Sequence, residues 1–93
     1  MDEDGYPTEE ELEKIKTWKY NDFHGLMGYV KSLWNWNGYG FEKVGDTYNV
    51  STYGWSGNED LISAMEQNQM FWILHWEQSR RGGHYIFSKS FYQ

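Results

Sequence analysis

Two glycine-containing loops carry the residues of this chain that are best suited to bind a ligand. The first is Trp55-Ser56-Gly57-Asn58, which joins a predicted strand to the start of a predicted helix. Free backbone amides and the positive end of the helix dipole favour anions there, and glycine allows close approach to the backbone. Trp55 offers a ring for stacking, and Ser56 and Asn58 add hydrogen-bonding groups. The alternative is a turn whose glycines serve only the backbone conformation.

The second loop, over residues 80–85, holds both arginines of the chain, Arg80 and Arg81. The planar guanidinium suits phosphate or carboxylate and also stacks on rings. His84 supplies a titratable donor, and Tyr85 supplies a ring with a hydroxyl group. The alternative is a basic turn that is simply exposed to solvent. If the last strand pairs with the strand before the first loop, the two loops meet at one end of the sheet.

The sequence shows no residue pattern typical of catalysis or of a metal site. His24, His75 and His84 lack the spacing of zinc ligands, and the chain has no cysteine. Ser56 is preceded by Gly54-Trp55, which does not match the G-x-S-x-G nucleophile elbow. Walker and dinucleotide-binding glycine patterns are also missing. We therefore expect a binding protein without cofactor or metal, not an enzyme.

Aromatic residues make up 20% of the chain, with six Trp, eight Tyr and five Phe. Each ring buries roughly 150–250 Å², so the thin core of one small domain does not need all of them. The rest are expected in a surface groove or a protein interface, unless the core is unusually rich in rings. Trp34, Trp36 and Tyr39 surround one loop and suggest a protein-binding surface.

Charge is distributed unevenly. The net charge is −6, and seven of the fourteen acidic residues lie in residues 1–13, which contain no base. We expect residues 1–7 to be a disordered acidic tail. The remaining residues hold all eight basic residues of the chain and seven acidic ones. They contain no long basic run, which argues against binding to a nucleic-acid duplex. Without a signal peptide or an apolar run long enough to span a membrane, the expected location is cytoplasmic.

Hydrophobic periodicity predicts two helices at the beginning of the chain. Thr8 and Glu11 form a capping box for a helix over about residues 8–19. Asn21 or Asp22 caps a second helix, which ends in Asn35-Trp36-Asn37-Gly38.

From residue 39 the apolar period changes to two, which is typical of strands. Strands over Tyr39–Val44 and Thr47–Tyr53 flank Gly45-Asp46, a two-residue hairpin signal. The remaining predicted elements are a helix over about residues 58–68 capped by Asn58 or Ser56, a strand over Met70–Glu77 and a last strand over His84–Ser90. The order α-α-β-β-α-β-β predicts a single α+β domain over residues 8–93, an antiparallel sheet with helices packed on one side. Its edge strands would be protected in a symmetric homodimer.

Four short segments resemble a family of small proteins encoded by bacteriophages and prophages. They are Tyr-Pro-Thr-Glu-Glu-Glu-Leu at 6–12, Gly-Trp-Ser-Gly-Asn-Glu at 54–59, Phe-Trp at 71–72 and Arg-Gly-Gly-His-Tyr at 81–85. The resemblance implies an accessory phage protein of the bacterial cytoplasm that inhibits or evades host functions, including defence systems. It assigns a role to no particular residue.

Together these observations lead to two functional hypotheses. In the first, the protein sequesters an anionic, ring-containing small ligand such as a nucleotide or cyclic oligonucleotide signal. Trp55 and Tyr85 would stack on its bases, Arg80, Arg81 and the amides near Gly57 would hold phosphate, and the other polar loop residues would read its edges. In the alternative, the protein occludes a host protein through its aromatic and acidic surface.

Overall fold

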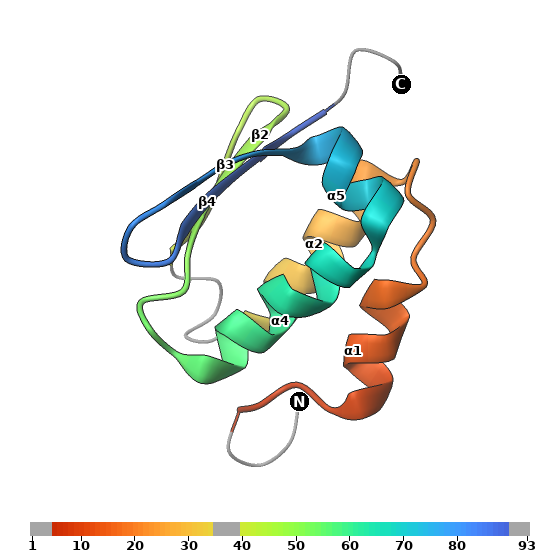
Figure 1. The fold of residues 1–93 in the computed structure, drawn as a ribbon, viewed down its shortest axis with the longest axis vertical. Helices are drawn as coiled ribbons and strands as arrows, with labels where there is room; N and C mark the ends of the chain where they lie inside the picture. Colours follow the sequence, from red (N-terminus) through yellow and green to blue (C-terminus); the bar gives the residue numbers. More distant parts are fainter. Residues whose placement is uncertain (1–4, 35–39, 90–93) are drawn as a thin grey trace.

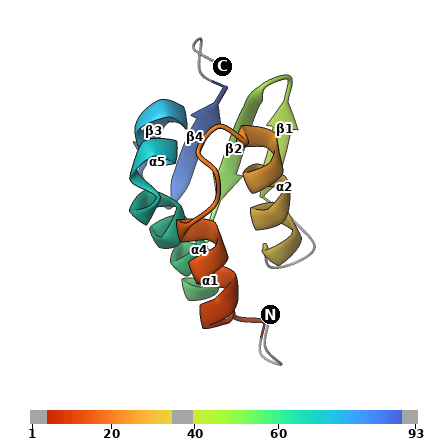
Figure 2. The same cartoon turned by 90° about the vertical axis from the view of Figure 1, so that its right-hand side faces the viewer.

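The computed structural model describes residues 5–34 and 40–89 as one α+β unit. Its elements are α1 (Glu9–Lys16), α2 (Phe23–Leu33), β1 (Phe41–Val44), β2 (Thr47–Ser51), α4 (Ser56–Gln67), α5 (Gln69–His75), β3 (Trp76–Arg80) and β4 (His84–Ser88). The strands form a four-stranded antiparallel sheet in the order β1-β2-β4-β3. The helices cover one face of this sheet and leave the other face open (Figures 1 and 2). The predicted α+β class, antiparallel sheet and one-sided helices are confirmed.

The first two helices begin where their capping residues predict. The Glu11 amide donates to Thr8 Oγ1 at 3.2 Å, and the Thr8 amide donates to Glu11 Oε1 at 2.8 Å, which completes the capping box. Asp22 caps α2 by accepting a hydrogen bond from the Gly25 amide at 3.2 Å. These contacts satisfy amides that have no partner inside their own helix.

The predicted strand over Met70–Glu77 is wrong: α5 occupies residues 69–75, and β3 begins only at Trp76. Phe71 and His75 are buried and lie four residues apart, one turn of a helix, while Ile73 between them is exposed. Nearly every side chain in this segment is apolar, so a period of two and a period of 3.6 fit equally well. Packing of residues 69–75 against α4 and the sheet stabilises the helical conformation.

The start of α4 also differs from the prediction. The helix begins at Ser56, with Trp55 at the N-cap position and no side-chain capping bond, so neither Asn58 nor Ser56 is the cap. Asn58 lies within the first turn and is buried. The chain leaves β2 at Ser51, two residues earlier than predicted, because the backbone turns at residues 52–55.

The core lies between the helices and the covered face of the sheet. It consists of Ile15, Phe23, Leu26, Met27, Val30, Leu33, Trp34, Phe41, Tyr48, Val50, Leu61, Ile62, Ala64, Met65, Phe71 and Phe87. Trp34 is only 1% exposed, so it cannot belong to a partner-binding surface, and Trp36 and Tyr39 lie outside the described residues. No helix in the described ranges is long and apolar enough to cross a membrane.

Candidate functional site

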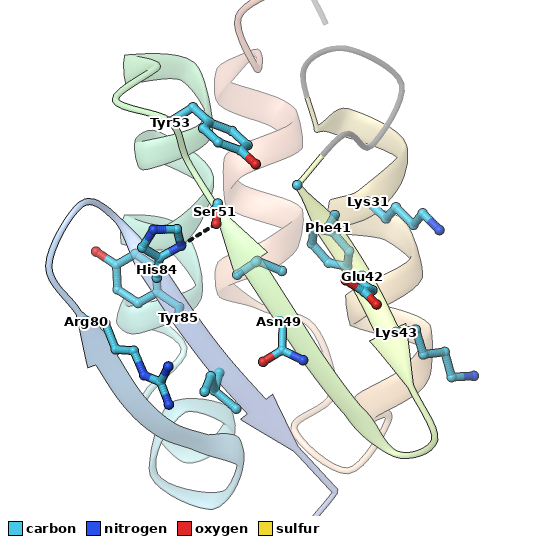
Figure 3. A pocket seen from close by; sticks show the side chains of 13 residues that line it. Lys31, Phe41, Glu42, Lys43, Asn49, Ser51, Tyr53, Arg80, His84 and Tyr85 are labelled. Atoms are coloured by element: carbon cyan, nitrogen blue, oxygen red, sulfur yellow. Dashed lines mark hydrogen bonds between the residues drawn. The ribbon is translucent and has the colours of Figure 1, made fainter.

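The open face of the sheet is hollowed, and this hollow is the candidate site. Its volume is about 790 Å³, within the range of roughly 300–1,000 Å³ common for small-molecule sites. Figure 3 shows side chains from all four strands around it, with Tyr53 at one end and Lys31 of α2 beside β1. The polar and charged side chains that line it are Lys31, Glu42, Lys43, Asn49, Ser51, Tyr53, Arg80 and His84.

The pairing of β2, β4 and β3 places Ser51, His84 and Arg80 in one row across the sheet. Ser51 is the register partner of His84 on β2, and Arg80 is its partner on β3. Ser51 Oγ and His84 Nδ1 form a hydrogen bond that orients the imidazole ring (Figure 3). Within the described ranges, no residue forms a hydrogen bond with His84 Nε2. This second nitrogen can therefore bind a ligand.

Arg80 extends from the edge strand β3 towards β4 on the open face (Figure 3). Its Nε donates to Gln78 Oε1 at 3.2 Å, which steadies the side chain. The ion pairs found in the described part of the chain, Lys16–Glu13 and His24–Asp46, do not involve this arginine. The terminal nitrogens of its guanidinium group are therefore available for a carboxylate or phosphate.

Arg80 and Glu42 are the charged residues that belong to the open face itself. Lys31 and Lys43 lie at the β1 border of the hollow, and their side chains point away from it (Figure 3). Lys43 Nζ lies 5.9 Å from the centre of the Tyr48 ring. The two lysines add positive charge near this border, although the chain carries a net charge of −6, and this favours the approach of an anionic ligand.

Tyr53 closes one end of the hollow in an unusual backbone conformation. Its φ angle of 53° is the only positive value among the described residues other than glycine. The Trp55 amide donates to Thr52 O at 3.0 Å, so Tyr53 and Gly54 are the central residues of a tight turn. A left-handed conformation costs a side-chain-bearing residue about 1–2 kcal/mol, and such outliers are concentrated at functional sites.

Gly40 provides the space that the Tyr53 ring occupies. A Cβ atom at residue 40 would lie 2.6 Å from Tyr53 Cε2, and Gly40 itself has a φ of 82°. The ring therefore lies directly against the backbone at the beginning of β1, and the residue is still 52% exposed. One side of the ring is supported by the protein, while the exposed part can stack on a planar ligand.

The segment that follows β2 meets the turn before β4 at one end of the sheet, because β4 pairs with β2. The Thr52 amide donates to Gly83 O at 3.0 Å, which joins the segment after β2 to the turn before β4. Of the residues proposed from the second loop, Arg80, His84 and Tyr85 line the hollow. Arg81 is exposed in the turn and does not line it.

Tyr85 contributes little of its ring to the open face. The ring packs against Trp72 and Phe87, with centroid distances of 6.5 Å to each. Both neighbours lie on the covered side of the sheet, where Phe87 is fully buried. Tyr85 therefore stabilises the core and is poorly placed to stack on a ligand in the hollow.

The first loop lies away from the hollow. The Trp55 ring contacts the Tyr6 ring at 4.6 Å, and Ser56 Oγ donates to the Tyr6 hydroxyl at 3.1 Å. Gly57 and Asn58 are buried in the first turn of α4. Trp55, Ser56, Gly57 and Asn58 are thus next to the N-terminal segment and do not join Arg80 and His84.

Six polar or charged residues that line the hollow were not singled out from the sequence: Lys31, Glu42, Lys43, Asn49, Ser51 and Tyr53. The alternating pattern of β2 could have indicated Asn49 and Ser51 as residues of the open face, because they alternate with the buried Tyr48 and Val50. No sequence pattern marks Tyr53, since its left-handed backbone is not expected for a tyrosine.

A second polar cluster joins α2 to the β1–β2 turn. His24 Nδ1 lies 2.8 Å from the Tyr48 hydroxyl, and His24 Nε2 lies 3.2 Å from Asp46 Oδ1. In the neutral ring, Nε2 donates to the carboxylate and Nδ1 accepts from the tyrosine. Burial, aided by the Asp46 charge, raises the pKa of Tyr48, so its hydroxyl stays protonated and is a poor nucleophile. The cluster positions the helix on the hairpin.

No metal centre is recognisable in the part of the chain that the structure describes, because no three potential His, Asp or Glu ligands converge there. Comparisons of the chain with models of protein families, with curated proteins and with solved structures found no match. The geometry of the hollow is therefore the basis on which a function is proposed.

Proposed function

We propose that this protein binds and sequesters an anionic, ring-containing small ligand of the nucleotide or cyclic oligonucleotide class, without catalysing a reaction. The observation that carries the proposal is the hollow on the open sheet face, where Arg80 and the oriented His84 lie in the same concavity as the Tyr53 ring. Anion-binding and ring-stacking groups within one hollow match a ligand that has both a phosphate and a base.

The ligand's phosphate is assigned to Arg80 and His84 Nε2, which are adjacent in the β3–β4 register. Its base is assigned to the exposed part of the Tyr53 ring. Asn49 lies on β2 on the other side of Ser51 from Tyr53, and it offers both donors and an acceptor to sugar or phosphate oxygens (Figure 3). Lys31 and Lys43 add longer-range attraction for the anion.

Arg80 and His84 keep the phosphate-binding and hydrogen-bonding roles predicted from the sequence. Tyr53 takes the stacking role that was predicted for Trp55 and Tyr85. Trp55 is already covered in part by Tyr6, and its loop lies on the helix side. A binding protein of this kind would act in the bacterial cytoplasm and counter host defence by removing a signal, as the phage resemblance implies. The alternative, occlusion of a host protein, loses one of its supporting residues because Trp34 is buried.

Calorimetric titration with nucleoside monophosphates and cyclic dinucleotides tests the proposal. An Arg80→Gln variant should bind about 10- to 100-fold more weakly, because a charged hydrogen bond contributes about 1.5–3 kcal/mol. Arg81→Gln is the matched control, since it removes the same charge one residue outside the hollow and should retain the affinity of the unaltered protein. Absence of binding across the panel, or equal affinity of the Arg80 variant, would contradict the proposal.

A further inference from the structure

The outer edge of β3 is an unprotected sheet edge. Within the described residues β3 pairs only with β4, and all five of its residues are exposed. An unpaired edge of this kind can hydrogen-bond to another strand. The opposite edge, β1, has four residues against five in β3, and a shorter strand offers fewer backbone groups to a partner.

Charges along this edge are complementary to those of a second copy. Glu77 lies near the beginning of β3, whereas Arg80 and Arg81 lie at its end. When two identical strands pair antiparallel around a two-fold axis, the beginning of each faces the end of the other. The acid of one copy then meets a base of the other, and the contact occurs twice.

One register satisfies both the charges and the faces of the sheet. With Ser79 on the two-fold axis, Gln78 lies opposite Arg80 of the second copy, and Glu77, the residue of the β-bulge, lies next to the turn that carries Arg81 of that copy. Gln78 and Arg80 belong to the same face, because they are partners of Ile86 and His84 on β4. The β-bulge between Trp76 and Gln78 lies at the beginning of the strand, so residues 78–80 keep a regular register.

An exposed apolar surface adjoins the same edge. The α5 helix runs directly into β3, and Met70, Ile73 and Trp76 are 50%, 73% and 38% exposed. The Trp76 ring stacks on Trp72 with a centroid distance of 5.8 Å and an interplanar angle of 11°. In the register above, Trp76 lies beside the turn over residues 81–83 of the second copy, and the two glycines of that turn allow it to approach the ring closely.

We infer that two copies of this chain associate through antiparallel pairing of their β3 strands around Ser79. The pairing joins the two sheets into one of eight strands and makes their open faces continuous. Glu77 and Arg81 determine the register, and Trp76 is covered by the partner's turn. The inference does not depend on the proposed ligand.

Sedimentation equilibrium of the full chain and of charge variants tests this interface. The unaltered protein should form a dimer at high micromolar concentration. Glu77→Arg and Arg81→Glu should each weaken the dimer at least tenfold, because each places like charges next to one another. The double variant restores opposite charges and should recover most of the affinity. Glu10→Arg, on the exposed side of α1, is the control and should leave the dimer unchanged.

Three results would overturn the inference: a monomeric unaltered protein, a dimer that neither single variant weakens, or a double variant as weak as the single ones. The substituted side chains are exposed in the monomer, so their thermal unfolding should match that of the unaltered chain once extrapolated to low concentration. A variant that fails to fold alone would contradict the assumption that β3 is a free edge.

Discussion

Replacing Tyr53 separates the strain of its backbone from the contact its ring makes with a ligand. Tyr53→Ala removes the ring but keeps a Cβ atom in the left-handed conformation, whereas Tyr53→Gly removes both. The left-handed conformation costs alanine about 1–2 kcal/mol. Glycine loses more entropy on folding, a disadvantage of roughly 0.4–1 kcal/mol. The difference leaves the glycine variant about 0.5–1 kcal/mol more stable than the alanine variant.

Thermal unfolding measures this difference. In a domain of this size, 1 kcal/mol corresponds to about 4–8 °C in Tm, so Tyr53→Gly should melt a few degrees above Tyr53→Ala. The sign is informative because glycine normally lowers loop stability relative to alanine. An alanine variant that melts at the higher temperature would refute the assigned strain at residue 53.

Ligand titration of the same two variants isolates the role of the ring. Stacking of a base on an aromatic side chain contributes about 1–3 kcal/mol, so both variants should bind roughly 5- to 150-fold more weakly than the unaltered protein. The two losses should be similar, because neither variant has a ring. Unchanged affinity in both would show that the base does not stack on Tyr53, even if Arg80 still contributes to binding.

Three further predictions concern stability. Asn68→Ala should cost about 2–3 kcal/mol in chemical denaturation, because the buried Asn68 amide donates to the carbonyls of Ile15 at 3.0 Å and Trp18 at 2.9 Å, which would lose these partners. Burial lowers the pKa of His75 below 6.5, despite opposing hydrogen bonds to backbone carbonyls. The unfolded chain therefore binds the proton first, so stability should fall as the pH drops below about 6.5 and continue to fall until the lowered pKa is passed. His75→Gln should flatten that part of the stability profile, and a slope that persists would assign it to another group. Gly83→Ala should lower Tm, because a Cβ atom there would lie 2.2 Å from Thr52 Oγ1 and residue 83 has a φ of 78°; an unchanged Tm would contradict the close approach of Thr52 to this turn.

The starts of the first two helices and the hairpin turns could be predicted from the sequence because their causes are local. Thr8 and Glu11 lie three residues apart and satisfy each other's backbone amides within one turn. Gly45 and the pair Gly82-Gly83 adopt positive φ values that other residues reach only at a cost, so the turns occur where glycine occurs. Half of the second loop's proposed residues, Arg80 and His84, belong to the site because they flank such a turn.

The segment over residues 69–76 could not be assigned from its own residues. Its side chains are apolar at almost every position, so the pattern does not distinguish a helix from a buried strand. The choice depends on neighbours distant in sequence: Phe71 packs on Phe23 and Phe87, and the His75 ring lies 4.4 Å from that of Phe23. Such contacts exist only after the chain has folded.

By itself the sequence determined the α+β class, the caps of the first two helices, the hairpin turns and the presence of anion-binding and ring-bearing side chains. Only the tertiary structure decided which of these share a site. The β2–β4 register brings Ser51 to His84 across 33 residues of chain, and the turn at residues 52–55 directs Trp55 to Tyr6 and Tyr53 to the open face. Local propensity acts over a few residues, whereas a binding site depends on which sheet face each strand presents, and that is set by burial of the core on the other face.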